Sequence, residues 1–153
     1  MANTSRSRTL SGRRFARELA MKILFQVDVG KLPLDEVLEL AFEEVTLAPE
    51  DRDYVLDVCR GVLAHQPELD QIISDLAEGW RLERMANVDR NVTRIALYEI
   101  LYRDDVPDSV AVNEAVEIAK KYSTEESGRF VNGILGSFLR RRASGSVTQP
   151  APP

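Results

Sequence analysis

The sequence predicts an all-α protein, and three observations support this fold class. Apolar residues recur at spacings of three and four along most of the chain, which is the pattern of helices that bury one face. No segment alternates apolar and polar residues for long enough to suggest a βαβ unit. Proline or glycine stands between the periodic segments, where these residues begin or end helices. We therefore expect helices joined by short turns.

The N-terminal region predicts a basic arm followed by a helix. Residues 1–10 lack apolar periodicity and carry two arginines, so we expect a disordered arm that is able to order on binding. A helix is predicted from Gly12 to Val29, with Gly30 placed to end it. Its inward face would comprise Phe15, Ala16, Leu19, Ala20, Ile23, Leu24 and Val27.

The opposite face of this helix gathers basic and aromatic residues, namely Arg14, Arg17, Met21 and Phe25 with Arg13 and Lys22 beside them. An exposed aromatic ring among arginines suits single-stranded nucleic acid, because phosphates pair with guanidinium and an unstacked base lies on the ring. Two alternatives stay open. Met21 and Phe25 would pack against other helices beside solvated arginines, or the Arg-rich start would be a transit peptide, against which the long apolar face argues.

Three further helices are predicted before residue 80. Pro33 opens one that continues to about Val45, and Pro49 opens the next, which reaches about His65 and buries a reduced Cys59. The first three helices have short joins and predict a small bundle. A fourth helix runs from Pro67 to Gly79. The apolar residues after it form either a partner-binding edge or a cap on the core, and they are Trp80, Leu82 and Met85.

The segment from Val88 to Arg103 predicts the central helix. It is apolar around most of its circumference, so other helices are expected to surround it. Another helix follows Pro107, and Ser123 and Glu126 have the spacing of a capping box for the last one.

The last helix carries two glycines, Gly133 and Gly136, on the side opposite its apolar face. Each costs about 1 kcal/mol relative to alanine, which indicates that a neighbouring helix or a ligand approaches the backbone there. Residues 143–153 predict a flexible tail.

Composition excludes several classes of function. The 153 residues suit one domain, and no apolar run approaches the ~20 residues of a membrane span. The lone His65 and Cys59 argue against a zinc site or a nucleophilic catalytic centre, and no glycine-rich phosphate loop is present. Residues 1–31 are basic with seven Lys or Arg against two acids, whereas 32–89 have four against fifteen. We expect a cytoplasmic protein without cofactor, metal or catalysis, and with a localised anionic partner.

Four segments occur in a distinctive order: RRFARELAMKILFQ, VDRNVTRIALYEILYRDDVP, VAVNEAVEIAKKYS and SGRFVNGILG. Over about residues 11–140 they resemble the NusB family of bacterial transcription antitermination factors. The last segment is the most specific, because amphipathicity alone does not demand Asn-Gly after Phe-Val.

The resemblance implies two small three-helix bundles, about residues 11–66 and 67–142, packed around a shared central helix within one RNA-binding domain. It also implies binding to the boxA element of ribosomal RNA leader transcripts together with NusE, a small-subunit ribosomal protein. RNA polymerase would then read through terminators.

The resemblance also assigns roles to single residues. Arg13, Arg14 and Arg17 match the family's N-terminal arginine-rich RNA-binding motif. Phe25 stands where the family has an aromatic residue, often tyrosine, so a hydroxyl is lost while stacking is retained. Asp89 and Arg90 match a charged pair near the RNA. The implied RNA site on the last helix comprises Glu126, Arg129, Phe130, Asn132 and Gly133.

The leading hypothesis is therefore a non-enzymatic antitermination factor that works as a heterodimer with NusE. Its arginines would hold the RNA backbone, Phe25 and Phe130 would stack on bases, and Asn132 would contact a base edge. Two alternatives are a helical protein-interaction adaptor with a basic arm and a relative of the helical domain of ribosomal RNA methyltransferases. Those enzymes continue into a Rossmann-like cofactor domain, whereas this sequence ends at Pro153.

Overall fold

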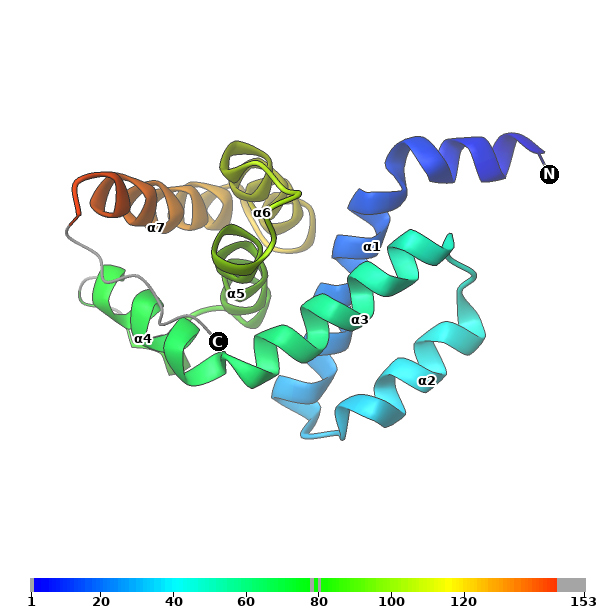
Figure 1. Ribbon diagram of the computed structural model, residues 1–153. Coiled ribbons are helices and arrows are strands. Elements are labelled where there is room, and N and C mark those ends of the chain that lie inside the picture. The colour runs from blue at the N-terminus through cyan, green and yellow to red at the C-terminus, as the bar shows by residue number, and fades with distance from the viewer. Residues whose placement is uncertain (1, 78, 80, 146–153) are drawn as a thin grey trace. The chain divides into compact units, whose positions relative to one another are not determined.

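The computed structural model describes residues 2–77, 79 and 81–145, with side chains from residue 12 onward (Figure 1). Within these ranges all regular structure is helical, which confirms the all-α prediction. The helices are α1 (Ala2–Gly30), α2 (Leu34–Glu44), α3 (Pro49–Ala64), α4 (Gln66–Leu76), the 3₁₀ turn η1 (Leu82–Arg84), α5 (Asn87–Tyr102), α6 (Asp108–Tyr122) and α7 (Glu125–Ala143). Trp80 and residues 146–153 of the expected tail lie outside the described residues. None of the described helices is long and apolar enough to cross a membrane.

The chain forms two compact units, Met1–Ala64 and His65–Pro153. In the first unit α1 packs against both α2 and α3. Helix α1 also extends through residues 2–10, where we expected a disordered arm. Extending an existing helix needs no new nucleation, so this segment can be helical without an apolar face of its own.

The buried side of α1 differs from the predicted one. Phe15, expected inside, is 40% exposed, whereas Arg17, expected on the opposite face, is 4% exposed. Met21 is 2% exposed, in agreement with the alternative that it packs against other helices. Because two helices pack against α1, its buried arc is wider than the single face that periodicity indicates. Cys59 is fully buried as predicted, with Sγ 3.8 Å from the carbonyl oxygen of Ala20, and burial raises the pKa of its thiol.

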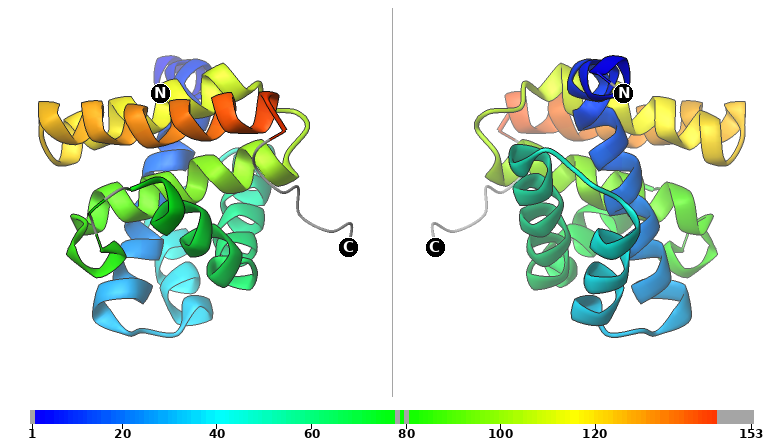
Figure 2. Two further views of the ribbon diagram at one scale, coloured as in Figure 1. Left: turned by 90° about the vertical axis from the view of Figure 1, so that its left-hand side faces the viewer. Right: turned by 90° about the vertical axis from the view of Figure 1, so that its right-hand side faces the viewer.

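In the second unit α5 is central and packs against α4, α6 and α7. Figure 2 shows α6 and α7 lying alongside each other. Every residue of α5 from Asp89 to Ile100 is buried, including charged ones. Arg94 is held by a two-pronged ion pair, Nε to Asp70 Oδ1 at 2.7 Å and Nη2 to Asp70 Oδ2 at 2.9 Å, which joins α5 to α4. The predicted central helix is thus surrounded, and a carboxylate on α4 satisfies one of its buried charges.

The start of α7 corrects the predicted cap. Thr124 is the N-cap, and its hydroxyl accepts from the backbone N–H of Ser127 at 2.9 Å. The predicted pair was Ser123 and Glu126. Helix α7 begins at Glu125, so the residue directly before it, Thr124 rather than Ser123, stands at the capping position. The Ser123 hydroxyl instead lies 2.9 Å from that of Ser127.

Candidate nucleic-acid interface

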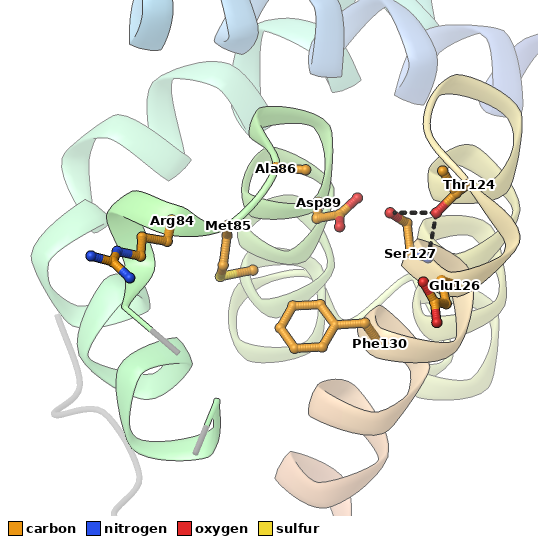
Figure 3. Close-up of a pocket in the computed structure, with 8 residues that line it drawn as sticks. All are labelled: Arg84, Met85, Ala86, Asp89, Thr124, Glu126, Ser127 and Phe130. Atoms are coloured by element: carbon orange, nitrogen blue, oxygen red, sulfur yellow. Dashed lines mark hydrogen bonds between the residues drawn. The ribbon is translucent and has the colours of Figure 1, made fainter. Parts of the chain in front are cut away.

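A cavity of about 420 Å³ opens in the second unit where the first turns of α5 and α7 meet η1 (Figure 3). This volume lies within the ~300–1,000 Å³ typical of small-ligand pockets. Its lining residues are Arg84, Met85, Ala86, Asp89, Thr124, Glu126, Ser127 and Phe130. Phenyl and thioether groups supply an apolar wall, and hydroxyl and carboxyl groups supply the polar one. The cavity can therefore hold a flat, partly polar group such as a nucleobase.

Asp89 supplies the buried acceptor of this cavity. It is 5% exposed, and its Oδ1 has no hydrogen-bond partner among the described residues. In Figure 3 its carboxyl group faces Ser127 across the cavity. Burial raises the pKa of the Asp89 carboxyl, and a side-chain hydrogen bond with Ser127 offsets part of the rise. A buried carboxylate oxygen without a donor favours a ligand that brings an N–H or O–H group.

A network of hydroxyl groups lies next to Asp89. Thr124 Oγ1 donates to Ser127 Oγ at 3.2 Å. The Ser123 and Ser127 hydroxyl oxygens lie 2.9 Å apart. Because Ser127 accepts from Thr124, its own proton is available for the hydrogen bond with Asp89. The network therefore orients one side of the carboxylate, and Oδ1 is the oxygen left without a partner among the described residues.

The outer side of α7 continues from the cavity. Glu126, Arg129, Asn132 and Gly133 are exposed, and Phe130 is half-buried at the cavity wall. A Cβ atom added to Gly133 would meet no atom within 4 Å. A neighbouring helix among the described residues thus does not account for this glycine. Helix α7 presents an open strip of cationic, amide and backbone groups beside an aromatic ring.

Arg90 is directed into the protein. It is 9% exposed, and it donates from Nη1 to the carbonyl oxygen of Leu82 at 3.2 Å and from Nη2 to Asn87 Oδ1 at 2.7 Å. These bonds fasten η1 to the first turn of α5. Met85 is only 5% exposed and lines the cavity wall, which favours the alternative of a cap on the core over an exposed partner-binding edge. Leu82 is half-buried.

The three N-terminal arginines occupy different environments in the first unit. Arg14 is exposed. Arg13 donates from Nε to Asp51 Oδ1 at 3.2 Å, and its guanidinium carbon lies 4.5 Å from the centre of the Tyr54 ring. The guanidinium carbon of Arg17 lies 5.5 Å from the same ring, and this arginine is buried. The arginines therefore cannot contribute equally to binding an anion.

A sequence model described as the NusB family matches residues 14–140. This chain belongs to the NusB family. The transcription antitermination protein NusB of Ruminiclostridium cellulolyticum is 51% identical over 129 residues, 84% of this chain and 89% of that protein. NusB of Salinispora arenicola is 45% identical over 128 residues, 83% of this chain and 94% of that protein.

Solved NusB structures are similar as well. T. maritima NusB has a TM-score of 0.78 at 40% identity, covering 84% of this chain and 90% of that chain. A crystal structure of antitermination factors NusB and NusE in complex with dsRNA has a TM-score of 0.77 at 25% identity, covering 84% and 96%.

Within the second unit, the structure brings together several of the residues that the NusB resemblance assigned. Asp89, Glu126 and Phe130 line one cavity, and Arg129, Asn132 and Gly133 follow on the same helix. Phe25 is half-buried on α1, in the first unit. The RNA-contacting roles of all these residues stay predictions.

Sequence reasoning missed several residues of these sites. On the cavity these are Arg84, Ala86, Thr124 and Ser127, and beside the N-terminal arginines they are Asp51 and Tyr54. The Thr-x-x-Ser spacing at the start of α7 was an available signal for the hydroxyl pair. No signal in the sequence around Asp51 indicated its role, because its partner Arg13 lies on another helix.

Proposed function

We propose that this NusB-family chain is an antitermination factor that binds boxA-type RNA of ribosomal RNA leader transcripts together with NusE. The main support for this proposal is the cavity at the starts of α5 and α7. Asp89, whose Oδ1 is a buried acceptor, and Phe130 both line it. An unstacked base that stacks on the ring and donates an N–H to the carboxylate would satisfy both groups. The solved NusB and NusE complex with dsRNA supports nucleic acid and NusE as partners.

The proposal divides the contacts by chemistry. The exposed Arg14 and Arg129 neutralise phosphates, and Phe130 and the half-buried Phe25 offer stacking surfaces. Asn132 contacts a base edge, and Gly133 allows the RNA backbone to lie close to α7. The chain is not an enzyme in this proposal. It acts in the cytoplasm, within the RNA polymerase antitermination complex.

Titration of labelled RNA at fixed salt tests the proposal. The ligands are single-stranded boxA RNA, a scrambled strand of the same composition and a duplex. We expect boxA to bind more tightly than the scrambled strand, and NusE to raise its affinity through linkage, because each ligand stabilises the state that binds the other. Equal affinity for boxA and scrambled RNA, with and without NusE, would refute the proposed function and favour an adaptor of another kind.

A further inference from the structure

Asp51 is an acidic residue in direct contact with Arg13, the first of the three N-terminal arginines. It lies in the first turn of α3, is 7% exposed, and accepts from Arg13 Nε at 3.2 Å. Tyr54, one helical turn further on, lies 4.5 Å under the Arg13 guanidinium. One helix face thus supplies both a carboxylate and a ring to the same cation.

These two contacts leave a defined part of Arg13 available. A guanidinium has five N–H donors in one plane, and the Nη1 and Nη2 edge can bind two oxygens of a phosphate at once. Asp51 takes the Nε position and Tyr54 covers one face of the plane. Asp51 is the only hydrogen-bond acceptor recorded for Arg13 among the described residues, and the Arg13 side chain is 32% exposed. The outer edge is therefore held in place and still accessible.

Gly12 makes this arrangement possible. A Cβ atom at residue 12 would lie 2.5 Å from Asp51 Oδ2, which is closer than real Cβ contacts. The Asp51 carboxylate therefore occupies the space that a side chain at residue 12 would need. Gly12, Asp51 and Tyr54 together form a seat for Arg13, which we call the Arg13 seat.

We propose that Asp51 is a positioning residue for RNA binding, which pre-orients the outer guanidinium edge of Arg13 toward one backbone phosphate. The inference rests on the proposed RNA-binding function and adds a residue that touches no RNA itself. A long side chain that is already ordered before binding loses less conformational entropy when the RNA binds. Binding RNA does not require Asp51 to move, because the phosphate and the carboxylate use different edges of the guanidinium.

The sign of one mutational effect separates this role from simple electrostatics. Asp51→Ala makes the chain one unit less negative than its formal charge of −5. Non-specific attraction of RNA should therefore increase, since fewer protein charges repel the phosphates. Loss of the Arg13 seat predicts the opposite, a fall in affinity of about two- to tenfold, the range expected for losing the order of one long side chain.

Five variants and the wild type form the experiment. Each is titrated with boxA RNA at one salt concentration and at a temperature well below its melting temperature. Glu50→Ala is the matched control, because it removes an exposed acid from the same helical turn. Asp51→Asn keeps an oxygen acceptor for Nε and should bind RNA more tightly than Asp51→Ala. Arg13→Ala and its combination with Asp51→Ala complete a double-mutant cycle, in which Asp51→Ala should cause no further loss once Arg13 is absent.

Gly12→Ala disturbs the Arg13 seat without changing any charge. Alanine has a higher helix propensity than glycine, so α1 should remain helical by circular dichroism. Its methyl group must displace the Asp51 carboxylate, and RNA affinity should fall as it does in Asp51→Ala. This variant decides the question even where Asp51→Ala does not fold.

The outcomes are distinct. Reduced affinity in Asp51→Ala and Gly12→Ala, with none in Glu50→Ala, supports the Arg13 seat. Equal or higher affinity in Asp51→Ala and in Gly12→Ala overturns it while leaving the proposed function intact. Wild-type protein that does not distinguish boxA from scrambled RNA overturns the proposed function, and the inference with it.

Discussion

Gly133 offers the sharpest test of whether the glycines of α7 serve packing or a ligand. A Cβ atom there meets nothing within 4 Å, so a leucine side chain would extend into open space. Replacing glycine by leucine inside an exposed helix should stabilise the protein by about 0.8 kcal/mol. For a chain of this size, that gain raises the melting temperature by about 2–3 °C. At the same time, the bulk should weaken RNA binding if the RNA lies along this strip.

Two other positions of the same helix provide controls. A Cβ atom at Gly128 would lie 2.6 Å from Lys120 Cγ, so Gly128→Ala must displace the Lys120 side chain, and it should gain less stability than Gly133→Leu. Ile134 is 4% exposed, and Ile134→Ala should cost about 2–5 kcal/mol whatever the function.

Thermal unfolding by circular dichroism and titration of boxA RNA measure the two effects separately. We expect Gly133→Leu to melt above the wild type and to lose about tenfold in affinity, equivalent to ~1.4 kcal/mol. A Gly133→Leu protein that melts below the wild type would contradict the open surface. Normal RNA binding by the stabilised protein would instead leave this strip without a role in RNA recognition.

Three further predictions concern other parts of the molecule. Arg14→Ala and Arg13→Ala should each make the slope of log K against log salt shallower by ~0.7. Arg17 is buried, so Arg17→Ala should lower the melting temperature and leave the slope unchanged. Removing all three should thus change the slope by ~1.4, and a change near ~2 would show that Arg17 also meets a phosphate. Folding raises the pKa of Asp89, so the folded protein binds a proton more readily than the unfolded chain does. The free energy of unfolding therefore falls as the pH rises through the raised pKa and Asp89 ionises. The melting temperature of Asp89→Asn relative to the wild type should therefore be higher near pH 7 than near pH 4, and a difference that does not depend on pH would contradict this. Thr124→Ala should cost ~1 kcal/mol by removing the cap of α7, and a larger loss in Ser123→Ala than in Thr124→Ala would favour the Ser123 cap instead.

Local features of the sequence predicted the helices well. Pro33, Pro49 and Pro107 mark the starts of α2, α3 and α6, and the apolar circumference of Val88–Arg103 predicted a helix buried on all sides. These signals act within one helix, so no knowledge of neighbours is needed to interpret them.

Features that depend on two helices meeting were not predictable in the same way. Arg17 is buried beside the Tyr54 ring of α3, and a one-face pattern cannot show how many helices pack on α1. Arg13 and Asp51 are 38 residues apart, and nothing in their local sequence pairs them. The cavity likewise requires the starts of α5 and α7 to meet, so Asp89 and Phe130 could be named singly but not as its shared wall.

The bonds of Arg90 affect how a mutational survey of this chain should be interpreted. Arg90 joins the backbone at Leu82 to the first turn of α5, and the segment between them carries Arg84, Met85 and Ala86 on the cavity wall. Loss of the guanidinium would release that wall and weaken any ligand held there. A survey that scores RNA binding alone would then count Arg90 as an RNA contact, although its guanidinium binds the protein's own backbone. Melting temperatures measured beside the affinities would separate such scaffold residues from residues that touch RNA.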